Sequence, residues 1–274
     1  MNKLIKYISF LLIVISSVYI TKEVINFKKD IILLEGHQAS AVVKKERMLN
    51  PSVMITMINM PSLEDMMFFQ SLGEDISIEE HIFNSLEVSS SSATGFSISY
   101  DAASNNSLLV TNDHFCQEYK EDSVLTIDKS SSDRLTSDPL SLDGEVILTD
   151  PSRDLCLIVA NGYVRPVEIA DYNYHPTSFE KVYIVGAPNG NFPIIIDTYI
   201  SGFIKRDKID LGSLSDDGSN FIILSEQIIH GHSGSAVFSE KGDVIGIVFA
   251  TMGAYGGLAI SHRDLISLLE EHSN

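Results

Sequence analysis

The sequence predicts an all-β fold, either an antiparallel barrel or a pair of packed sheets. Three observations carry this prediction: short apolar runs recur from about residue 50 onward, turn residues such as Asn-Asn and Asp-Gly separate them, and no helical segments alternate with them. A chain of 274 residues, 44% of them hydrophobic, can fill a core with such strands.

The expected strands follow one another with short polar connections. In chain order they are Ser52–Met60, Gly95–Tyr100, Ser107–Thr111, Ser123–Asp128, Glu145–Thr149, Leu155–Ala160, Lys181–Gly186, Phe192–Ile204, Asn220–Leu224, Ser235–Phe238, Val244–Thr251 and Gly257–Ser261. Two helices are expected, Ser77–Leu86 before most of the strands and Arg263–Glu271 at the end. The polar segment Lys129–Leu140 reads as a surface loop, and residues 61–92 form an insertion to which the sequence assigns no role.

The first 30 residues differ from the rest in charge. They hold five Lys against one Glu and one Asp, a local charge of +3, and Tyr7–Thr21 is an uncharged, mostly apolar run. A basic start before an apolar run is typical of a signal anchor or a secretory signal peptide, assigned here to residues 1–21. We favour an uncleaved anchor because no small-residue cleavage site ends the run, with a buried helix as a further alternative. Residues 22–49 then read as a juxtamembrane linker.

The anchor implies a membrane-attached protein with an exported domain, periplasmic or extracellular. Its orientation stays open, because Lys residues flank the apolar run almost equally on both sides.

Charge and cysteine content exclude two classes of function. The chain carries 19 Lys and Arg against 37 Asp and Glu, a formal net charge of −18 at pH 7, and such a surface repels the phosphates of nucleic acids. Two cysteines cannot build a structural zinc site or an iron–sulfur cluster from thiolates alone.

Three separated motifs carry the candidate chemistry. Gly231-His232-Ser233-Gly234 places a serine between glycines, which permits a sharp turn with an exposed hydroxyl and converging backbone N–H groups. His114 follows the apolar strand Leu108–Thr111, where its ring could act as a general base. Asp154 opens the apolar strand Leu155–Ile158, where its carboxylate could orient an imidazole. Each motif alone is also compatible with an ordinary turn residue.

Together the three residues follow the order of the chymotrypsin-type triad, His114, Asp154 and Ser233. Further segments match the trypsin-like serine proteases, and most closely the HtrA/Deg catalytic domain: Ala93-Thr94-Gly95-Phe96, Leu109–His114, Ser152–Leu155, Val182–Gly190, Ile200–Gly202, Gly242–Ile247 and Gly257–Ile260. The chain therefore resembles that family over residues 50–270.

The resemblance implies a specific architecture and a specific mechanism. It implies a protease domain at 50–274, with two six-stranded antiparallel β-barrels at about 50–165 and 176–262 and a closing helix at 263–271. It also implies a serine endopeptidase that forms an acyl-enzyme on polypeptide substrates, with the backbone N–H groups of Gly231 and Ser233 as the oxyanion hole. Neither a cofactor nor a metal is required. HtrA-like relatives are often trimers, so a homo-oligomer is compatible with the resemblance.

The sequence departs from the family at the nucleophile turn and at the end of the chain. His232 stands where Asn or Asp is usual, and Ser235-Ala236 where Gly-Pro is common. The 13 residues after Ser261 are too few for a PDZ domain.

By the resemblance, a set of residues before the nucleophile and on a later strand lines the primary specificity pocket: Gln227, Ile228, Phe249, Ala250 and Thr251, with Tyr255-Gly256-Gly257 as a further wall. No acidic residue stands at the expected floor, although Glu226 is near in sequence, so a small or medium apolar substrate side chain is expected.

Four residues near the motifs have open roles. His230 and His232 could contact substrate or bind a metal as a pair, and exposed turn histidines are the default interpretation. Cys116 and Cys156 each lie two residues beyond a triad member. They could form a disulfide in an exported domain, with buried free thiols as the default.

Three other classes compete with an active protease. An α/β-hydrolase would need a helix after Ser233 and an Asp and a His downstream, but a strand-like segment follows. A catalytically silent protease-like domain could bind peptides or act as a scaffold, and the complete triad argues against it. A purely structural β-barrel leaves the three motifs unexplained.

Overall fold

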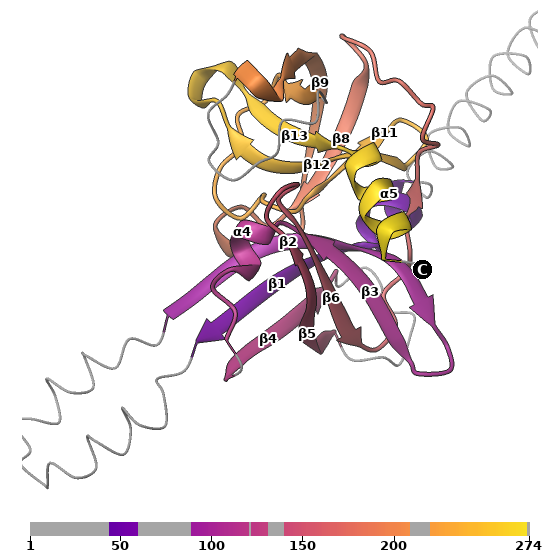
Figure 1. Ribbon diagram of the computed structural model, residues 1–274, viewed down its shortest axis with the longest axis vertical. Coiled ribbons are helices and arrows are strands. Elements are labelled where there is room, and N and C mark those ends of the chain that lie inside the picture. The colour runs from indigo at the N-terminus through magenta and orange to yellow at the C-terminus, as the bar shows by residue number, and fades with distance from the viewer. Residues whose placement is uncertain (1–43, 60–88, 121, 131–139, 209–219, 273–274) are drawn as a thin grey trace, which may run out of the picture. The chain divides into compact units, whose positions relative to one another are not determined.

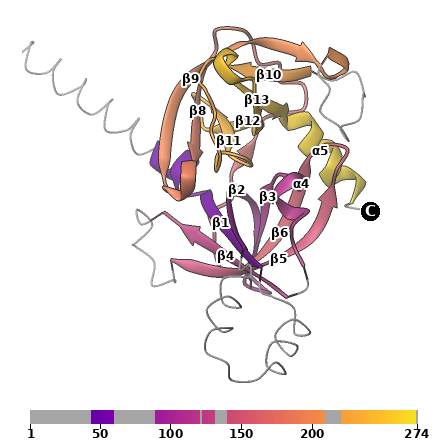
Figure 2. The ribbon, with the colours of Figure 1, turned by 90° about the vertical axis from the view of Figure 1, so that its left-hand side faces the viewer.

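The computed structural model describes residues 44–59, 89–120, 122–130, 140–208 and 220–272. The chain divides into two units, Met1–Lys44 and Lys45–Asn274, and the described fold belongs to the second. Its strands form two antiparallel systems, which Figure 1 and Figure 2 show as one group in indigo to pink and another in orange to yellow.

The first system is a closed barrel of six strands in the order β1-β2-β3-β6-β5-β4. Its members are β1 (Ser52–Asn59), β2 (Ser89–Asp101), β3 (Asn106–Thr111), β4 (Ser123–Lys129), β5 (Ser141–Asp150) and β6 (Leu155–Asn161). A four-residue helix, α4 (Asp113–Cys116), follows β3 directly.

The second system is a ring of six strands in the order β11-β8-β9-β10-β13-β12, closed by pairing of β11 with β12. Its members are β8 (Lys181–Gly186), β9 (Ile194–Lys205), β10 (Asn220–Leu224), β11 (Ala236–Ser239), β12 (Asp243–Thr251) and β13 (Gly257–Ser261). A two-residue strand, β7 (Glu168–Ile169), adds to β12 in parallel. The prediction of two six-stranded antiparallel barrels is therefore confirmed.

Strand β6 shows why its sequence is apolar throughout rather than alternating. Cys156, Ile158 and Ala160 point into the core of the first barrel, whereas Leu155 and Leu157 belong to a second cluster outside it. Because successive side chains of a strand point to opposite faces, a strand with both faces buried needs apolar residues at every position.

That second cluster joins the two barrels. It combines residues of the first barrel, such as Phe96 and Val110, with Tyr183 and Phe238 of the second, and all four are at most 5% exposed. A third cluster fills the interior of the second barrel. The core between the barrels fixes the two halves against each other and so positions any site that draws on both.

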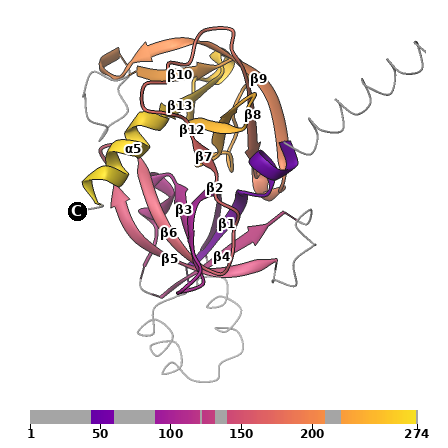
Figure 3. The same cartoon turned by 90° about the vertical axis from the view of Figure 1, so that its right-hand side faces the viewer.

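The terminal helix α5 (His262–Glu271) is anchored to both barrels (Figure 3). Asp264 forms a buried ion pair of 2.8 Å with Arg206 beside the second barrel. At the other end of the helix, Glu271 accepts a hydrogen bond from Arg153, just before β6 of the first barrel. The side chain of Ser261 caps the N-terminus by accepting from the N–H of Arg263.

The folded body begins earlier than the sequence indicated. Residues 45–49 were expected to end a linker, but they form a short π-helix, η1 (Lys45–Leu49). Met48 is 2% exposed within the core between the barrels, and the Arg47 side chain donates to the carbonyl of Lys241. Apolar burial and this hydrogen bond therefore make the segment part of the fold.

The boundaries of the predicted strands agree with the structure to within two residues, apart from β2 and β5. β2 begins six residues before the predicted Gly95 because Ser89–Ser92 pair with β1, and β5 begins four residues before Glu145 because its first residues pair with β4. β9 begins at Ile194, two residues later than predicted. The expected helix Ser77–Leu86, most of the loop Lys129–Leu140 and the proposed anchor at 1–21 lie outside the described residues. Among the residues that the structure describes, no helix combines the length and apolar character that a membrane span requires.

Candidate active site

The turn that carries Ser233 depends on two glycines with positive φ. Gly231 has φ +93°, and a Cβ there would lie 2.1 Å from the carbonyl oxygen of Ala187. Gly234 has φ +81°, and its Cβ would lie 2.1 Å from the carbonyl oxygen of Thr94. Only a residue without a side chain fits either position, so both glycines are required by the turn.

The turn orients two backbone amides. The carbonyl of His230 accepts from the N–H of Asn189 at 2.9 Å, and the carbonyl of His232 accepts from the N–H of Ser235 at 2.9 Å. In a trans peptide the N–H points opposite to the carbonyl, so these two bonds also direct the N–H groups of Gly231 and Ser233. Within the described part of the chain, neither N–H donates to a protein acceptor.

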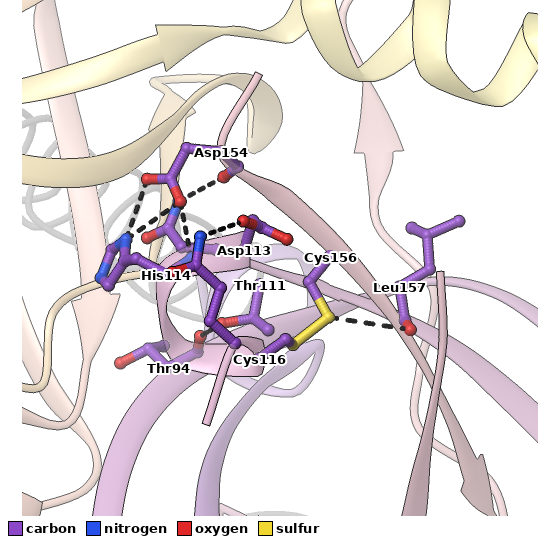
Figure 4. Close-up of a disulfide and its surroundings, with 10 residues drawn as sticks. Thr94, Thr111, Asp113, His114, Cys116, Asp154, Cys156 and Leu157 are labelled. Carbon is purple, nitrogen blue, oxygen red and sulfur yellow. Dashed lines mark hydrogen bonds and ion pairs between the residues drawn. A yellow bond between two sulfur atoms is a disulfide. The ribbon is translucent and has the colours of Figure 1, made fainter. Parts of the chain in front are cut away.

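His114 lies on α4, the helix that follows β3. Its ring Nδ1 lies 2.9 and 3.0 Å from the two carboxylate oxygens of Asp154, and its backbone N–H donates to the same carboxylate at 2.8 Å (Figure 4). The carboxylate therefore fixes Nδ1 as the protonated nitrogen and leaves Nε2 as a base. The ring is close to half exposed, whereas Asp154 is 8% exposed.

Asp154 occupies the left-handed region, with φ 54°, at the end of the turn before β6. Aspartate tolerates this conformation better than most residues. The side-chain amide of Asn112 donates to the carbonyl of Asp154 at 3.0 Å and holds the strained residue in place.

Opposing effects act on the pKa of His114. Burial lowers it, whereas Asp154 raises it through its hydrogen bond and its charge. The charges of Asp113 and Glu118 add to the increase, so the pKa lies above its ordinary value of 6.5. The ring is thereby suited to accept a proton near neutral pH.

One pocket of about 440 Å³ brings the predicted site together. Its lining includes His114 and Ser233, together with all five residues expected to line the specificity pocket: Gln227, Ile228, Phe249, Ala250 and Thr251. Ile229 and His230 line it as well. The segment Tyr255-Gly256-Gly257 was expected to form a wall, but none of its three residues is among the lining residues. Within the described residues, no hydrogen bond joins the Ser233 hydroxyl to the His114 ring.

His232 is not the exposed turn residue that the sequence suggested. It is 2% exposed, and its Nδ1 lies 3.2 Å from the carbonyl of Ile229. Room for the ring exists because the neighbouring residue 186 is glycine, whose Cβ would lie 2.8 Å from the His232 ring. Burial lowers the pKa of His232 below its ordinary value, although the hydrogen bond to the carbonyl of Ile229 opposes this shift. His230 is exposed at the pocket, as expected.

Cys116 and Cys156 form a disulfide, so the default prediction of free thiols was wrong. Their Cα atoms are 6.5 Å apart, which lies within the range that a disulfide needs. The bridge joins α4, which carries His114, to β6, which Asp154 precedes. Spacing from the two triad residues was the sequence signal, but only tertiary structure could show that the cysteine side chains meet.

Sequence reasoning missed the burial of Asp113 beside His114 and the contacts of Thr94 with the nucleophile turn. Asp113 is 1% exposed and accepts from the Gln117 side-chain amide at 2.7 Å, while its other carboxylate oxygen has no partner among the described residues. Both residues lie in segments that carry the family resemblance, Ala93–Phe96 and Leu109–His114, but the sequence does not show which distant groups their side chains contact.

Several solved structures share the fold. The serine endoprotease from Yersinia pestis has a TM-score of 0.56 at 15% identity, with 84% of this chain and 65% of that chain covered. An inactive Ser-to-Ala mutant of an M. tuberculosis H37Rv protein has a TM-score of 0.57 at 17% identity, with 84% of this chain and 89% of that chain covered. An HtrA-type protease with a decapeptide has a TM-score of 0.59 at 16% identity, with 86% of this chain and 68% of that chain covered. The chain thus spans less than two thirds of the Yersinia protein, and at these identities the likeness concerns the fold.

Sequence comparison gives the family. No curated protein matches the sequence. A family model described as a trypsin-like peptidase domain matches residues 93–247, which is more than half of the chain. The match contains all three candidate residues, His114, Asp154 and Ser233. The chain therefore belongs to the trypsin-like peptidase family.

Proposed function

We propose that this chain hydrolyses peptide bonds with Ser233 as nucleophile, His114 as general base and acid, and Asp154 as the group that orients the imidazole. The observation that carries the proposal is the ring of His114 bound to Asp154 in the same pocket that Ser233 lines. Because Nδ1 is bound to Asp154, Nε2 of His114 is the ring nitrogen that can accept a proton.

The reaction follows from these three groups in two halves. As the Ser233 Oγ bonds to the substrate carbonyl carbon, Nε2 takes the hydroxyl proton, and the resulting imidazolium returns it to the nitrogen of the leaving amine as the C–N bond breaks. The acyl group then sits on Oγ as an ester. Water enters, gives a proton to Nε2 and attacks the ester carbon, and the product acid leaves as Oγ regains the proton.

The backbone N–H groups of Gly231 and Ser233 donate hydrogen bonds to the oxyanion that forms during acylation and again during deacylation. Both lie in the nucleophile turn, and both lack protein acceptors in the described part of the chain. Loss of one such donor typically lowers kcat by about 10²- to 10³-fold.

The pocket favours an apolar side chain at the substrate residue before the cleaved bond. Ile228, Ile229, Phe249 and Ala250 supply apolar walls, and none of its described lining residues is acidic. Glu226 is exposed and outside this lining. A substrate cation would therefore be desolvated there without a partner, which is unfavourable. Peptides with an apolar residue at this position should be cleaved in preference to those with Lys or Arg.

A fluorophosphonate probe tests the assignment of the nucleophile. The probe should label the wild-type protein and should fail to label Ser233→Ala. The control variant Ser201→Ala, which removes an exposed serine hydroxyl from a strand, should be labelled as fully as the wild type. Peptide hydrolysis should follow the same pattern. Peptide binding by the wild-type protein without labelling or turnover would instead identify the catalytically silent alternative.

We also propose that the protease domain is exported and tethered by residues 1–21. Support comes from the basic and apolar pattern of that segment and from the disulfide, since disulfides persist mainly in oxidising compartments. Carbonate extraction of membranes from the native host should leave the full chain in the pellet. Release of the chain into the supernatant would contradict the tether.

A further inference from the structure

Thr94 lies on β2 of the first barrel, opposite the nucleophile turn of the second. It is 0% exposed, and its backbone N–H donates to the carbonyl of Ser233 at 2.8 Å. Its hydroxyl donates to the carbonyl of Gly231 at 2.7 Å and accepts from the N–H of Ala187 at 2.9 Å. Its own carbonyl accepts from the Thr111 hydroxyl at 2.8 Å (Figure 4).

These contacts meet the two residues whose amides would form the oxyanion hole. Gly231 and Ser233 each have a carbonyl bound to Thr94, while their N–H groups have no acceptor in the described part of the chain. Thr94 thus fixes one end of each residue and leaves the other end for the substrate.

Gly231 needs an external restraint more than other residues do. Without a side chain, glycine exchanges readily between positive and negative φ, so its peptide units can rotate at little energetic cost. The Thr94 hydroxyl bonds Gly231 and Ala187 at the same time, so it ties the turn to the segment after β8 as well. Without the hydroxyl, the carbonyl of Gly231 and the N–H of Ala187 would lose their partner. A change in the φ and ψ of Gly231 would relieve this loss, and it would also turn the preceding peptide unit, which carries the N–H of Gly231.

We propose that Thr94 is a positioning residue: its hydroxyl, supplied by the first barrel, holds the nucleophile turn of the second barrel so that the amides of Gly231 and Ser233 keep the orientation that an oxyanion requires. The inference rests on the proposed peptidase function. The oxyanion hole then depends on both barrels. The second barrel supplies the N–H donors, and the first barrel supplies the hydroxyl that aligns them.

Thr94→Val tests this role, because valine keeps the shape and strand preference of threonine and removes only the hydroxyl. We expect kcat for an apolar peptide substrate to fall about tenfold or more, in keeping with the effect of disturbing an oxyanion donor, and KM to change less than about twofold. Affinity for a peptidyl trifluoromethyl ketone, whose adduct places an oxyanion in the same position, should fall by about the same factor as kcat. Thr94→Ser, which keeps the hydroxyl, should retain most of the activity.

Ser107→Ala is the matched control. Ser107 is 1% exposed on β3, and its hydroxyl accepts from the backbone N–H of Val164 at 2.8 Å. It donates to the backbone carbonyl of Gly162 at 2.8 Å, with the carbonyl of Val164 farther away at 3.5 Å. Both of its partners belong to the first barrel region, away from the nucleophile turn. Ser107→Ala should therefore lose comparable buried hydrogen bonds, and its kcat should stay close to that of the wild type.

The outcomes separate the inference from the function on which it rests. If Thr94→Val loses no more kcat or ketone affinity than Ser107→Ala, or if Thr94→Ser is as impaired as Thr94→Val, the positioning role is wrong while wild-type activity stands. If the wild-type protein itself shows no hydrolysis that Ser233→Ala abolishes, the peptidase proposal fails instead. Should Thr94→Val not fold, Thr94→Ala replaces it in the same comparison.

Discussion

Three carboxylates raise the pKa of the His114 ring, those of Asp154, Asp113 and Glu118, and of these Asp154 is hydrogen-bonded to it. Asp154 binds Nδ1, whereas Asp113, the preceding residue in the chain, is buried with its side chain bound to Gln117. Burial is the largest effect on the pKa of Asp113 and raises it; the Gln117 hydrogen bond lowers it, and the charges of Asp154 and Asp150 raise it further. The charge of Asp113 is thus one of the effects that raise the pKa of His114.

Asp113→Asn should shift the pH dependence of catalysis. His114 acts as a base only when neutral, so activity is lost as pH falls through its pKa, which lies above 6.5. Removing the Asp113 charge removes one of the effects that raise this pKa. The acidic limb of the kcat/KM profile should therefore move to lower pH.

The distant variant Asp101→Asn provides the comparison for this profile, since Asp101 is exposed in the hairpin between β2 and β3. An acidic limb in Asp113→Asn that coincides with that of the wild type would show that the Asp113 charge does not act on His114.

Among the elements, α4 depends on a covalent link for its place. It has four residues, and no side chain caps its N-terminus. The disulfide from Cys116 to Cys156 connects it to β6 across a sequence separation of 40 residues. A helix of one turn has little stability of its own, so tertiary links must hold it.

Replacing both cysteines by alanine should destabilise the domain. Closing a loop of this length is worth about 3 to 4 kcal/mol through the entropy of the unfolded chain. Urea unfolding of the double variant should give a correspondingly lower free energy, and wild-type protein treated with dithiothreitol should resemble it. An unfolding midpoint that neither the substitutions nor the reductant changes would contradict the link between this disulfide and stability.

How far the sequence predicts these elements depends on where their hydrogen bonds and burial arise. Strands such as β8 (Lys181–Gly186) were predicted at their observed bounds, because their apolar runs end at turn residues. The extension of β2 through Ser89–Ser92 could not be predicted, because serines carry no apolar signal and the pairing with β1 is a backbone effect.

The candidate site shows the same division. His114, Asp154 and Ser233 could be predicted because each lies in a recognisable local motif. The roles of Thr94 and Asp113 and the burial of His232 arise from contacts between segments far apart in the chain, and no local pattern encodes such contacts.

At the scale of the whole molecule, the chain has a net charge of −18, whereas the described lining of the pocket contains no acidic residue. The charge therefore acts at long range, on the approach of substrate, rather than through contact with the side chain that enters the pocket. Such effects are screened over about 8 Å at physiological ionic strength.

Substrate charge outside the pocket should therefore govern the salt dependence of cleavage. For peptides that share one apolar residue before the cleaved bond, kcat/KM should fall with added NaCl when the flanking residues are Lys and rise when they are Glu, because salt screens attraction in the first case and repulsion in the second. A peptide with neutral flanks supplies the baseline. Equal salt responses for all three peptides would mean that the global charge does not steer substrates.

The disulfide also affects how damage to this protein would be noticed. The bridge encloses β4 and β5, so a single chain break anywhere between Cys116 and Cys156 leaves both fragments covalently attached. A peptidase that nicks its own copies in this interval would still migrate as one full-length band in a gel run without reductant. Autolysis there becomes visible only after the thiols are freed.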